Sequence, residues 1–202
     1  MKTILKRSCY LTVFILFFFS LLNCNSKGSN TTTNNPKKVK ATNNIQKLID
    51  SLKLDKNKIV IYIDKSDLKL SLKIDTIILK SYDVVLGGNQ VDDKRQEGDG
   101  CTPEGKFKVR AMYPHKSWSK FIWIDYPTKD SEKKFNASKK TGEIPKDATI
   151  GGQIGIHGVP EGCDYLIDKK QHWTLGCISL KNENINEVYK WVKVGTKITI
   201  VK

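Results

Sequence analysis

Two residues near the C-terminal end of the chain have side chains suited to nucleophilic catalysis. His157 ends an alternating run that begins at Thr149, and Cys177 follows Gly176 directly. A free thiol is only slightly ionised at neutral pH, so a nucleophilic cysteine needs a base that takes its proton. Histidine is suited to that task because it titrates close to neutrality. The pair therefore predicts covalent catalysis, with Cys177 as nucleophile and His157 as proton acceptor and donor.

Glycines beside both residues predict open surroundings for the pair. Gly155 lies two residues before His157, in a short predicted strand where a missing side chain lets a substrate approach closely. Gly176 permits a tight turn before Cys177. We therefore expect the backbone N–H groups of Gly176 and Cys177 to face an oxyanion. His172 is the alternative base.

The N-terminus has the pattern of an export signal. Three basic residues precede an apolar run at positions 10–22. This run is shorter than the roughly 20 residues of a membrane-spanning helix and is typical of a signal peptide. We expect residues 1–23 to be the signal and Cys24 to be lipidated, which predicts a membrane-anchored lipoprotein facing the periplasm or cell wall. A plain secretory signal or an uncleaved anchor are the alternatives, and both also predict export.

Export changes how the remaining cysteines are interpreted. Once Cys9 leaves with the signal and Cys24 is lipidated, Cys101, Cys163 and Cys177 remain. An odd number leaves at least one free thiol in an oxidising compartment, and Cys177 is the one with a histidine partner. Cys101 and Cys163 are a candidate disulfide, which would stabilise the fold by about 4 kcal/mol. Two free, partly buried thiols are the alternative.

The charge of the chain favours anionic partners. The sequence has 35 Lys+Arg and 21 Asp+Glu residues, a net charge of +14. A basic exported domain is attracted to wall polymers and membrane surfaces, although a solvated lysine-rich surface explains the charge equally well. We expect no nucleic acid partner, because the lysines are spread through the strands. No metal is expected, because the acidic loop at 89–105 lacks the spacing of a calcium loop.

Apolar periodicity predicts a mainly β domain after an N-terminal extension. Residues 24–57 comprise Cys24, a flexible tether and an amphipathic helix at 42–54, capped by Thr42 or Asn43. Residues 58–202 form the catalytic domain, a sandwich-like pair of mixed sheets with one C-terminal helix packed on it. That helix is predicted at 183–193, capped by Asn182 and closed by Gly195. Strands are predicted at 59–65, 68–73, 76–86, 105–112, 121–125, 153–157 and 196–201.

Separated motifs after residue 58 resemble the L,D-transpeptidase catalytic domain, also called the YkuD domain. The family signature is a histidine, two residues, a spacer of fourteen to seventeen, and then Ser/Thr-His-Gly-Cys. Here His157 is followed at that spacing by Thr-Leu-Gly-Cys at 174–177. Leu175 replaces the family histidine and Ser179 replaces a common arginine. The chain is similar in both changes to a YafK-like subgroup, whose other marks are D-K-R-Q-E-G-D-G-C-T-P-E-G at 93–105 and F-I-W-I-D-Y-P at 121–127.

The resemblance implies a reaction on peptidoglycan stem peptides without a cofactor. Cys177 would attack the carbonyl that follows the L-centre of a diamino acid and form a thioester. His157 would move the proton, oriented by the backbone carbonyl of Gly158, and the oxyanion would be held at Gly176 and Cys177. Transfer to an amine gives a cross-link or attaches a protein, whereas water gives carboxypeptidase or amidase activity. A wall-binding lipoprotein without catalysis is the alternative from another class.

The resemblance also implies a substrate groove with the loop at 89–105 as one wall. A solvated hairpin loop is the alternative for that segment. His115 is expected at the surface near this groove. The candidate groove residues are Lys94, Glu97, Asp99, Thr102, Ser117, Gly155 and Thr174.

Overall fold

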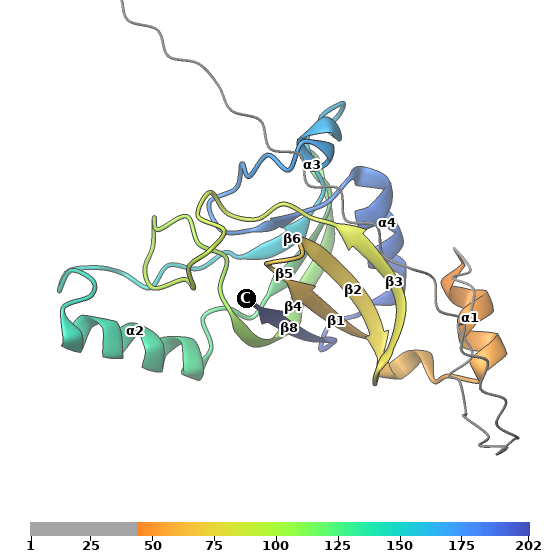
Figure 1. Cartoon of the computed structure of the whole chain (residues 1–202), viewed down its shortest axis with the longest axis horizontal. Coiled ribbons are helices and arrows are strands. Elements are labelled where there is room, and N and C mark those ends of the chain that lie inside the picture. Colours follow the sequence, from red (N-terminus) through yellow and green to blue (C-terminus); the bar gives the residue numbers. More distant parts are fainter. Residues whose placement is uncertain (1–43) are drawn as a thin grey trace, which may run out of the picture. The chain divides into compact units, whose positions relative to one another are not determined.

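The computed structural model describes residues 44–202 (Figure 1). The predicted signal peptide, Cys24, the tether and the predicted helix caps Thr42 and Asn43 all lie outside the described residues. Within the described part, no helix has both the length and the apolar character needed to cross a membrane.

The described residues form a single mixed sheet of eight strands, in the order β3-β2-β1-β8-β4-β5-β6-β7 (Figure 1). Strand β1 pairs in parallel with β8, and β6 pairs in parallel with β7, whereas the other neighbours are antiparallel. The predicted mainly β fold with mixed pairing is confirmed. The strands are β1 (Val60–Asp64), β2 (Lys69–Ile74), β3 (Ile77–Asp83), β4 (Gly105–His115), β5 (Ser119–Ile124), β6 (Gly155–His157), β7 (Ile178–Ser179) and β8 (Lys197–Val201).

Strand β4 connects the two halves of the sheet. Residues 105–108 pair with β8, and the strand pairs with β5 from Val109 onward, with a register shift between Val109 and Ala111. A bulge of this kind bends a strand and increases its twist. The two halves can therefore close around one core, which contains alternating buried residues such as Ile61, Ile63 and Ile198.

Two helices pack on the sheet through apolar faces. Helix α1 (Ile45–Leu52) contacts β3 and is capped by the side chain of Asn44, one residue after the predicted cap Asn43. Helix α4 (Asn182–Trp191) contacts β5. The predicted cap of α4 was wrong, because Asn182 lies inside the helix and no side chain caps its first turn. The prediction that Gly195 closes this helix was also wrong, since α4 ends at Trp191 and Gly195 lies just before β8.

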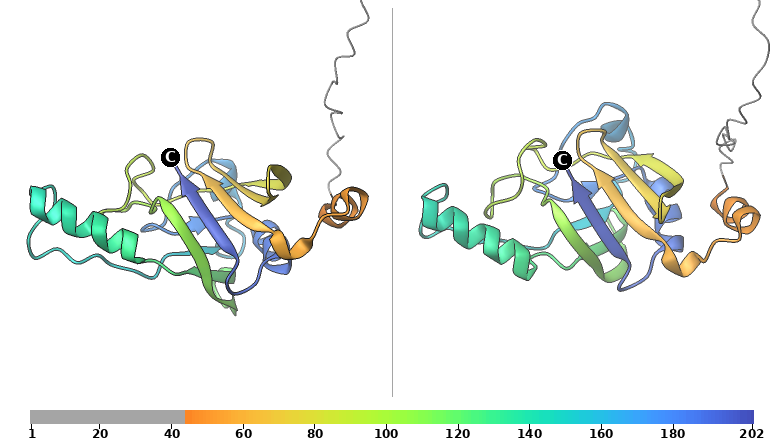
Figure 2. Two further views of the ribbon diagram at one scale, coloured as in Figure 1. Left: turned by 90° about the horizontal axis from the view of Figure 1, so that it is seen from below. Right: turned by 60° about the horizontal axis from the view of Figure 1, so that its bottom comes forward.

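Two further helices contradict the prediction of one helix in this domain. Helix α2 (Lys129–Thr141) is well capped, by Thr128 at its start and by Gly142 in the left-handed region at its end. It buries only Ser138, so its sequence has no apolar stripe from which a helix could be predicted. Figure 2 shows it away from the sheet. The short segments are α3 (Tyr165–Asp168) and the 3-10 turn η1 (Lys56–Lys58).

Candidate active site

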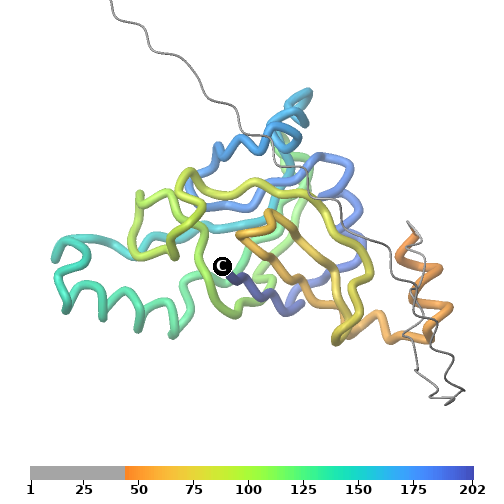
Figure 3. Tube along the Cα trace, viewed as in Figure 1, coloured from red at the N-terminus to blue at the C-terminus, as the bar shows by residue number. Residues whose placement is uncertain are grey.

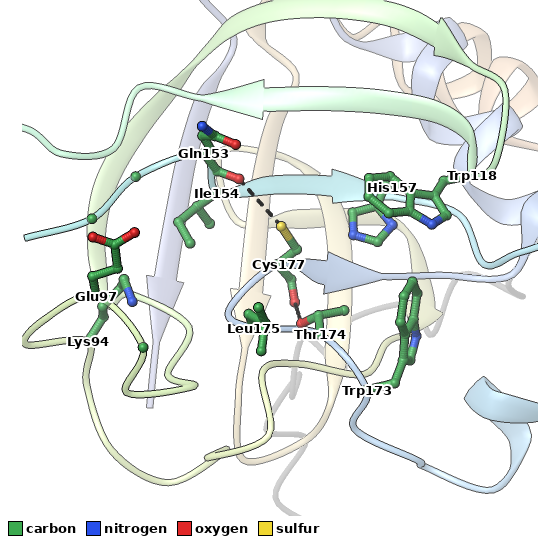
Figure 4. Close-up of a pocket in the computed structure, with 13 residues that line it drawn as sticks. Lys94, Glu97, Trp118, Gln153, Ile154, His157, Trp173, Thr174, Leu175 and Cys177 are labelled. Carbon is green, nitrogen blue, oxygen red and sulfur yellow. Dashed lines mark hydrogen bonds between the residues drawn. The ribbon is translucent and has the colours of Figure 1, made fainter.

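A cavity of about 600 Å³ contains both predicted catalytic side chains (Figure 4). His157 comes from β6 and Cys177 from the residue just before β7. These strands pair in parallel although α3 and its flanking loops separate them in sequence (Figure 3). The cavity has the size of a typical small-ligand site. Its walls are formed by Lys94, Glu97, Gly98, Trp118, Gly151, Gly152, Gln153, Ile154, His157, Trp173, Thr174, Leu175 and Cys177.

The imidazole of His157 packs in a cluster of aromatic rings. Trp118 stacks on it at a centroid distance of 4.5 Å, and Phe121 stacks at 5.6 Å. His157 Nδ1 lies 2.7 Å from the carbonyl oxygen of Gly158. A carbonyl only accepts hydrogen bonds, so Nδ1 carries the proton and Nε2 carries the lone pair. Burial lowers the pKa of His157 to about 4, and the ring is therefore neutral at pH 7.

The carbonyl of Gly158 has a second donor that the sequence did not suggest. The hydroxyl of Ser179 is fully buried and donates to Gly158 O at 3.2 Å. Ser179 stands at the position where the resemblance places an arginine in many members, and that departure was its signal in the sequence. Ser179 therefore helps to fix the carbonyl that orients His157.

Gly158 is enclosed so tightly that no side chain fits there. A Cβ atom would lie 2.1 Å from Asn182 Oδ1 and 2.6 Å from the carbonyl oxygen of Trp118. The N–H of Gly158 also donates to that Trp118 carbonyl at 3.0 Å. The glycine thus brings the turn holding Trp118 and the start of α4 close to the histidine.

The thiol of Cys177 is hydrogen-bonded to backbone atoms. Its Sγ accepts from the N–H of Gly155 at 3.4 Å. It donates to the carbonyl oxygen of Gln153 at 3.6 Å, as Figure 4 shows. Burial raises the pKa of the Cys177 thiol above its usual value. With His157 neutral and the thiol protonated, the resting site is a neutral pair rather than an imidazolium and a thiolate.

Gly176 forms the turn before Cys177, but its N–H is already engaged. It donates to Thr174 Oγ1 at 3.3 Å, and that hydroxyl donates to the carbonyl oxygen of Cys177 at 2.6 Å. Gly176 has φ +139°, and a Cβ there would lie 2.7 Å from the carbonyl oxygen of Cys101. The Gly176 N–H, which we expected to face an oxyanion, is thus used within the turn in this structure, and its oxyanion role stays a prediction.

Three of the predicted groove residues line the cavity, namely Lys94, Glu97 and Thr174. Asp99 lies outside the wall and accepts from Lys94 Nζ at 2.8 Å and from the N–H of Arg95 at 2.7 Å, which holds the loop together. Thr102 is buried and accepts from the N–H of Gly87 at 3.1 Å. Both residues support the wall without facing the cavity.

The remaining groove candidates also lie outside the wall. Ser117 is exposed in the turn before Trp118. Gly155 donates to the Cys177 sulfur, and a Cβ there would lie 2.3 Å from Cζ of Phe121. Sequence reasoning missed the wall residues Trp118, Trp173, Gln153 and Leu175. The turn that carries Trp118 is distant in sequence and reaches the site through the pairing of β5 with β6.

The other histidines are occupied elsewhere. Nδ1 of His172, the alternative base, accepts from the N–H of Leu86 at 3.0 Å, and His172 is not part of the cavity wall. His115 stacks on Trp118 at a centroid distance of 4.4 Å and is not part of the cavity wall. His157 is therefore the histidine that shares the cavity with the thiol.

Cys101, Cys163 and Cys177 are all free thiols, so the candidate bridge between Cys101 and Cys163 is absent. Cys101 is buried in the loop beside Asp99, whereas Cys163 packs in a small apolar cluster with Val159 before α3. Each thiol is thus packed within its own segment. Among residues 44–202, no group of three or more His, Cys, Asp or Glu side chains is arranged to hold a metal ion.

A buried neutral imidazole with a thiol in the same cavity defines a site of the cysteine–histidine type. The family model of the YkuD L,D-transpeptidase catalytic domain matches residues 58–200. The chain therefore belongs to the YkuD family, whose members act on peptidoglycan stem peptides. A comparison with curated proteins gave no match.

Solved structures with a similar fold include Bd1075 from Bdellovibrio bacteriovorus, with a TM-score of 0.50, 19% identity, and coverage of 71% of this chain and 48% of that one. The helical cell shape determining protein Pgp2 from Campylobacter jejuni has a TM-score of 0.50, 21% identity, and coverage of 71% and 47%. The alignments thus span about half the length of these chains. An L,D-transpeptidase from Xylanimonas cellulosilytica has a TM-score of 0.45, 16% identity, and coverage of 71% and 60%.

Proposed function

We propose that the chain is a cysteine-dependent L,D-transpeptidase that acts on peptidoglycan stem peptides. The observation that carries this proposal is the shared cavity of Cys177 and His157, with the imidazole fixed by Gly158 O at 2.7 Å. Membership of the YkuD family supplies the substrate class. An imidazole whose Nδ1–H is fixed and whose Nε2 is free has the tautomer that a proton-accepting base requires.

The acylation step begins from the neutral pair. His157 Nε2 takes the thiol proton as the sulfur of Cys177 forms a bond to the carbonyl carbon of the stem peptide. The tetrahedral intermediate then breaks its C–N bond, and His157 gives the proton to the leaving amine. The products are a thioester on Cys177 and a free D-amino acid.

Proton transfer belongs to the attack in this proposal and does not precede it. The pKa of His157 is about 4 and the thiol pKa is raised, so a preformed ion pair is disfavoured in the empty site. The thiol must also leave the carbonyl of Gln153 to face the imidazole. We infer that substrate in the cavity displaces this hydrogen bond and draws sulfur and Nε2 together.

An acceptor completes the cycle by attacking the thioester carbonyl. An amine gives a new amide bond and cross-links or attaches the peptide, whereas water gives the free acid and net hydrolysis. His157 takes the acceptor proton in both cases, and the thiol is regenerated.

The test is mass analysis of muropeptides after incubation with the purified chain. We expect loss of the terminal D-amino acid and a product joined to an added amine. A product of the same stem that gains water instead would reassign the activity to a carboxypeptidase. Cys177→Ala should form neither product. The proposal would be refuted if this variant still formed product. If the wild-type chain also formed no product, a wall-binding role would be favoured instead.

We also propose that the chain is exported and anchored by a lipid on Cys24. The basic residues and short apolar run before Cys24 support this proposal. Expression with a radiolabelled fatty acid should label the wild-type chain. Cys24→Ala should remove the label, and a chain that retains its first 23 residues would contradict the proposal.

A further inference from the structure

The charges that line the cavity do not balance. Lys94 and Glu97 are the charged residues in its wall. The ammonium of Lys94 is nearly fully buried and donates to Asp99 Oδ1 at 2.8 Å and to the carbonyl oxygen of Gln96 at 2.9 Å. Asp99 thus neutralises Lys94. Glu97 has no cationic partner among the described residues, so the wall carries one unmatched negative charge.

Glu97 is fixed in position by the neighbouring segment at residues 149–151. Its N–H donates to the carbonyl oxygen of Thr149 at 2.8 Å, and Thr149 Oγ1 donates to Glu97 Oε2 at 2.5 Å. Gly151 adopts φ +72°, and a Cβ there would lie 3.1 Å from the Cβ of Glu97. These contacts use one carboxylate oxygen. The other, Oε1, accepts no hydrogen bond from the residues that the structure describes.

The two ends of the cavity differ in chemistry. Figure 4 shows Lys94 and Glu97 on one side of Cys177, and Trp118 and Trp173 on the other. One end is thus aromatic, and the other presents a carboxylate with a free oxygen. In a chain of net charge +14, such an isolated carboxylate is a local site of attraction for a cation.

We propose that Glu97 recognises a primary ammonium group on the substrate. This inference rests on the proposed function and specifies its substrate as a peptide or acceptor that carries a free amine besides the reacting groups. The ammonium group would donate to Oε1, while Thr149 continues to hold Oε2. Its source is the diamino acid side chain of the donor stem or a second amine on the acceptor.

The variant Glu97→Gln tests the charge alone. Glutamine keeps a carbonyl oxygen that accepts from Thr149, but it removes the negative charge. Glu132→Gln is the matched control, because Glu132 is exposed on α2 and lies outside the cavity wall. Both changes are made in the full-length chain.

The first measurement is peptide binding by calorimetry in a Cys177→Ala background, where no turnover occurs. The probes are a stem tetrapeptide with a free side-chain amine and the same peptide acetylated on that amine. Loss of a partly exposed ion pair should weaken binding of the free-amine peptide about fivefold in Glu97→Gln. Glu97→Gln should not change the binding of the acetylated peptide. Glu132→Gln should not change the binding of either peptide.

The second measurement is the KM for a diamino acceptor in transfer from the acetylated donor, with Cys177 intact. A fivefold rise in Glu97→Gln, lost when the second amine of the acceptor is acetylated, assigns the recognised ammonium to the acceptor. Equal weakening of free and acetylated compounds would show that Glu97 only holds the loop. That result overturns the proposal. So does a result in which Glu97→Gln changes neither peptide binding nor the KM of the acceptor. Charge-selective binding without any product would sink the proposed function and leave this inference standing.

Discussion

The buried hydroxyl of Ser179 and the imidazole of His157 share one acceptor, the carbonyl oxygen of Gly158, at 3.2 and 2.7 Å. Both residues lie in paired strands, since His157 on β6 is opposite Ser179 on β7. The same strand pairing brings Cys177 next to Gly155. The orientation of His157 therefore depends on β7, the strand that directly follows Cys177.

Replacement of Ser179 by alanine should slow turnover without weakening substrate binding. Losing one neutral hydrogen bond removes about 1 kcal/mol, so we expect kcat to fall about fivefold with KM unchanged. Ser179→Thr keeps the hydroxyl and should restore most of the activity. The control is Ser71→Ala, which removes a buried hydroxyl that bonds only to Ser81. An equal loss of kcat in the control would make the effect one of general stability.

The rate of alkylation of Cys177 should depend on pH as expected for a thiol whose pKa is not lowered. Because the resting pair is neutral, the rate with iodoacetamide should rise steadily with pH above 7 and show no plateau at lower pH. His157→Gln should leave this profile nearly unchanged while lowering turnover of the stem peptide by about 10²- to 10⁴-fold. A plateau below pH 7 that disappears in the variant would show a thiolate–imidazolium pair instead.

Acid should destabilise the fold through His157. The pKa of this residue is lowered from 6.5 to about 4 in the folded chain, so between these values the unfolded chain binds more protons than the folded one. Stability is thus fully present above pH 6.5 and decreases as pH falls toward 4, by on the order of 3 kcal/mol. Urea unfolding of the wild type and of His157→Gln at several pH values should show that this decrease is absent from the variant. Parallel curves would contradict the prediction.

A methyl group at Gly158 should disrupt the site. Gly158→Ala places a Cβ within 2.6 Å of both Asn182 Oδ1 and the carbonyl of Trp118, so the fold should lose about 2 kcal/mol or more. Activity should fall further than stability alone explains, because the carbonyl that orients His157 must move. Gly88→Ala is the control, since its Cβ would have no atom within 4 Å. Unfolding curves and kcat of both variants decide the matter.

Local sequence patterns were sufficient to predict the helices and strands whose buried residues repeat regularly within one segment. The period of two in β1 reflects which of its side chains are buried, and the i, i+3, i+4 spacing at Ile45, Leu48 and Ile49 does the same for α1. Helix α2 was missed because it has caps but no buried face. Periodicity reports burial, so it cannot reveal an element that buries almost nothing.

The sequence by itself was enough to propose His157 and Cys177 as the catalytic pair, because a histidine and a cysteine at this spacing can be found without coordinates. Only the tertiary structure decided their state. Burial against Trp118 and Phe121 makes the histidine neutral, and the sulfur of Cys177 is hydrogen-bonded to backbone atoms of Gln153 and Gly155. These contacts join segments far apart in the chain. Their energies depend on distance and on exclusion of water, and neither quantity can be read from residue types alone.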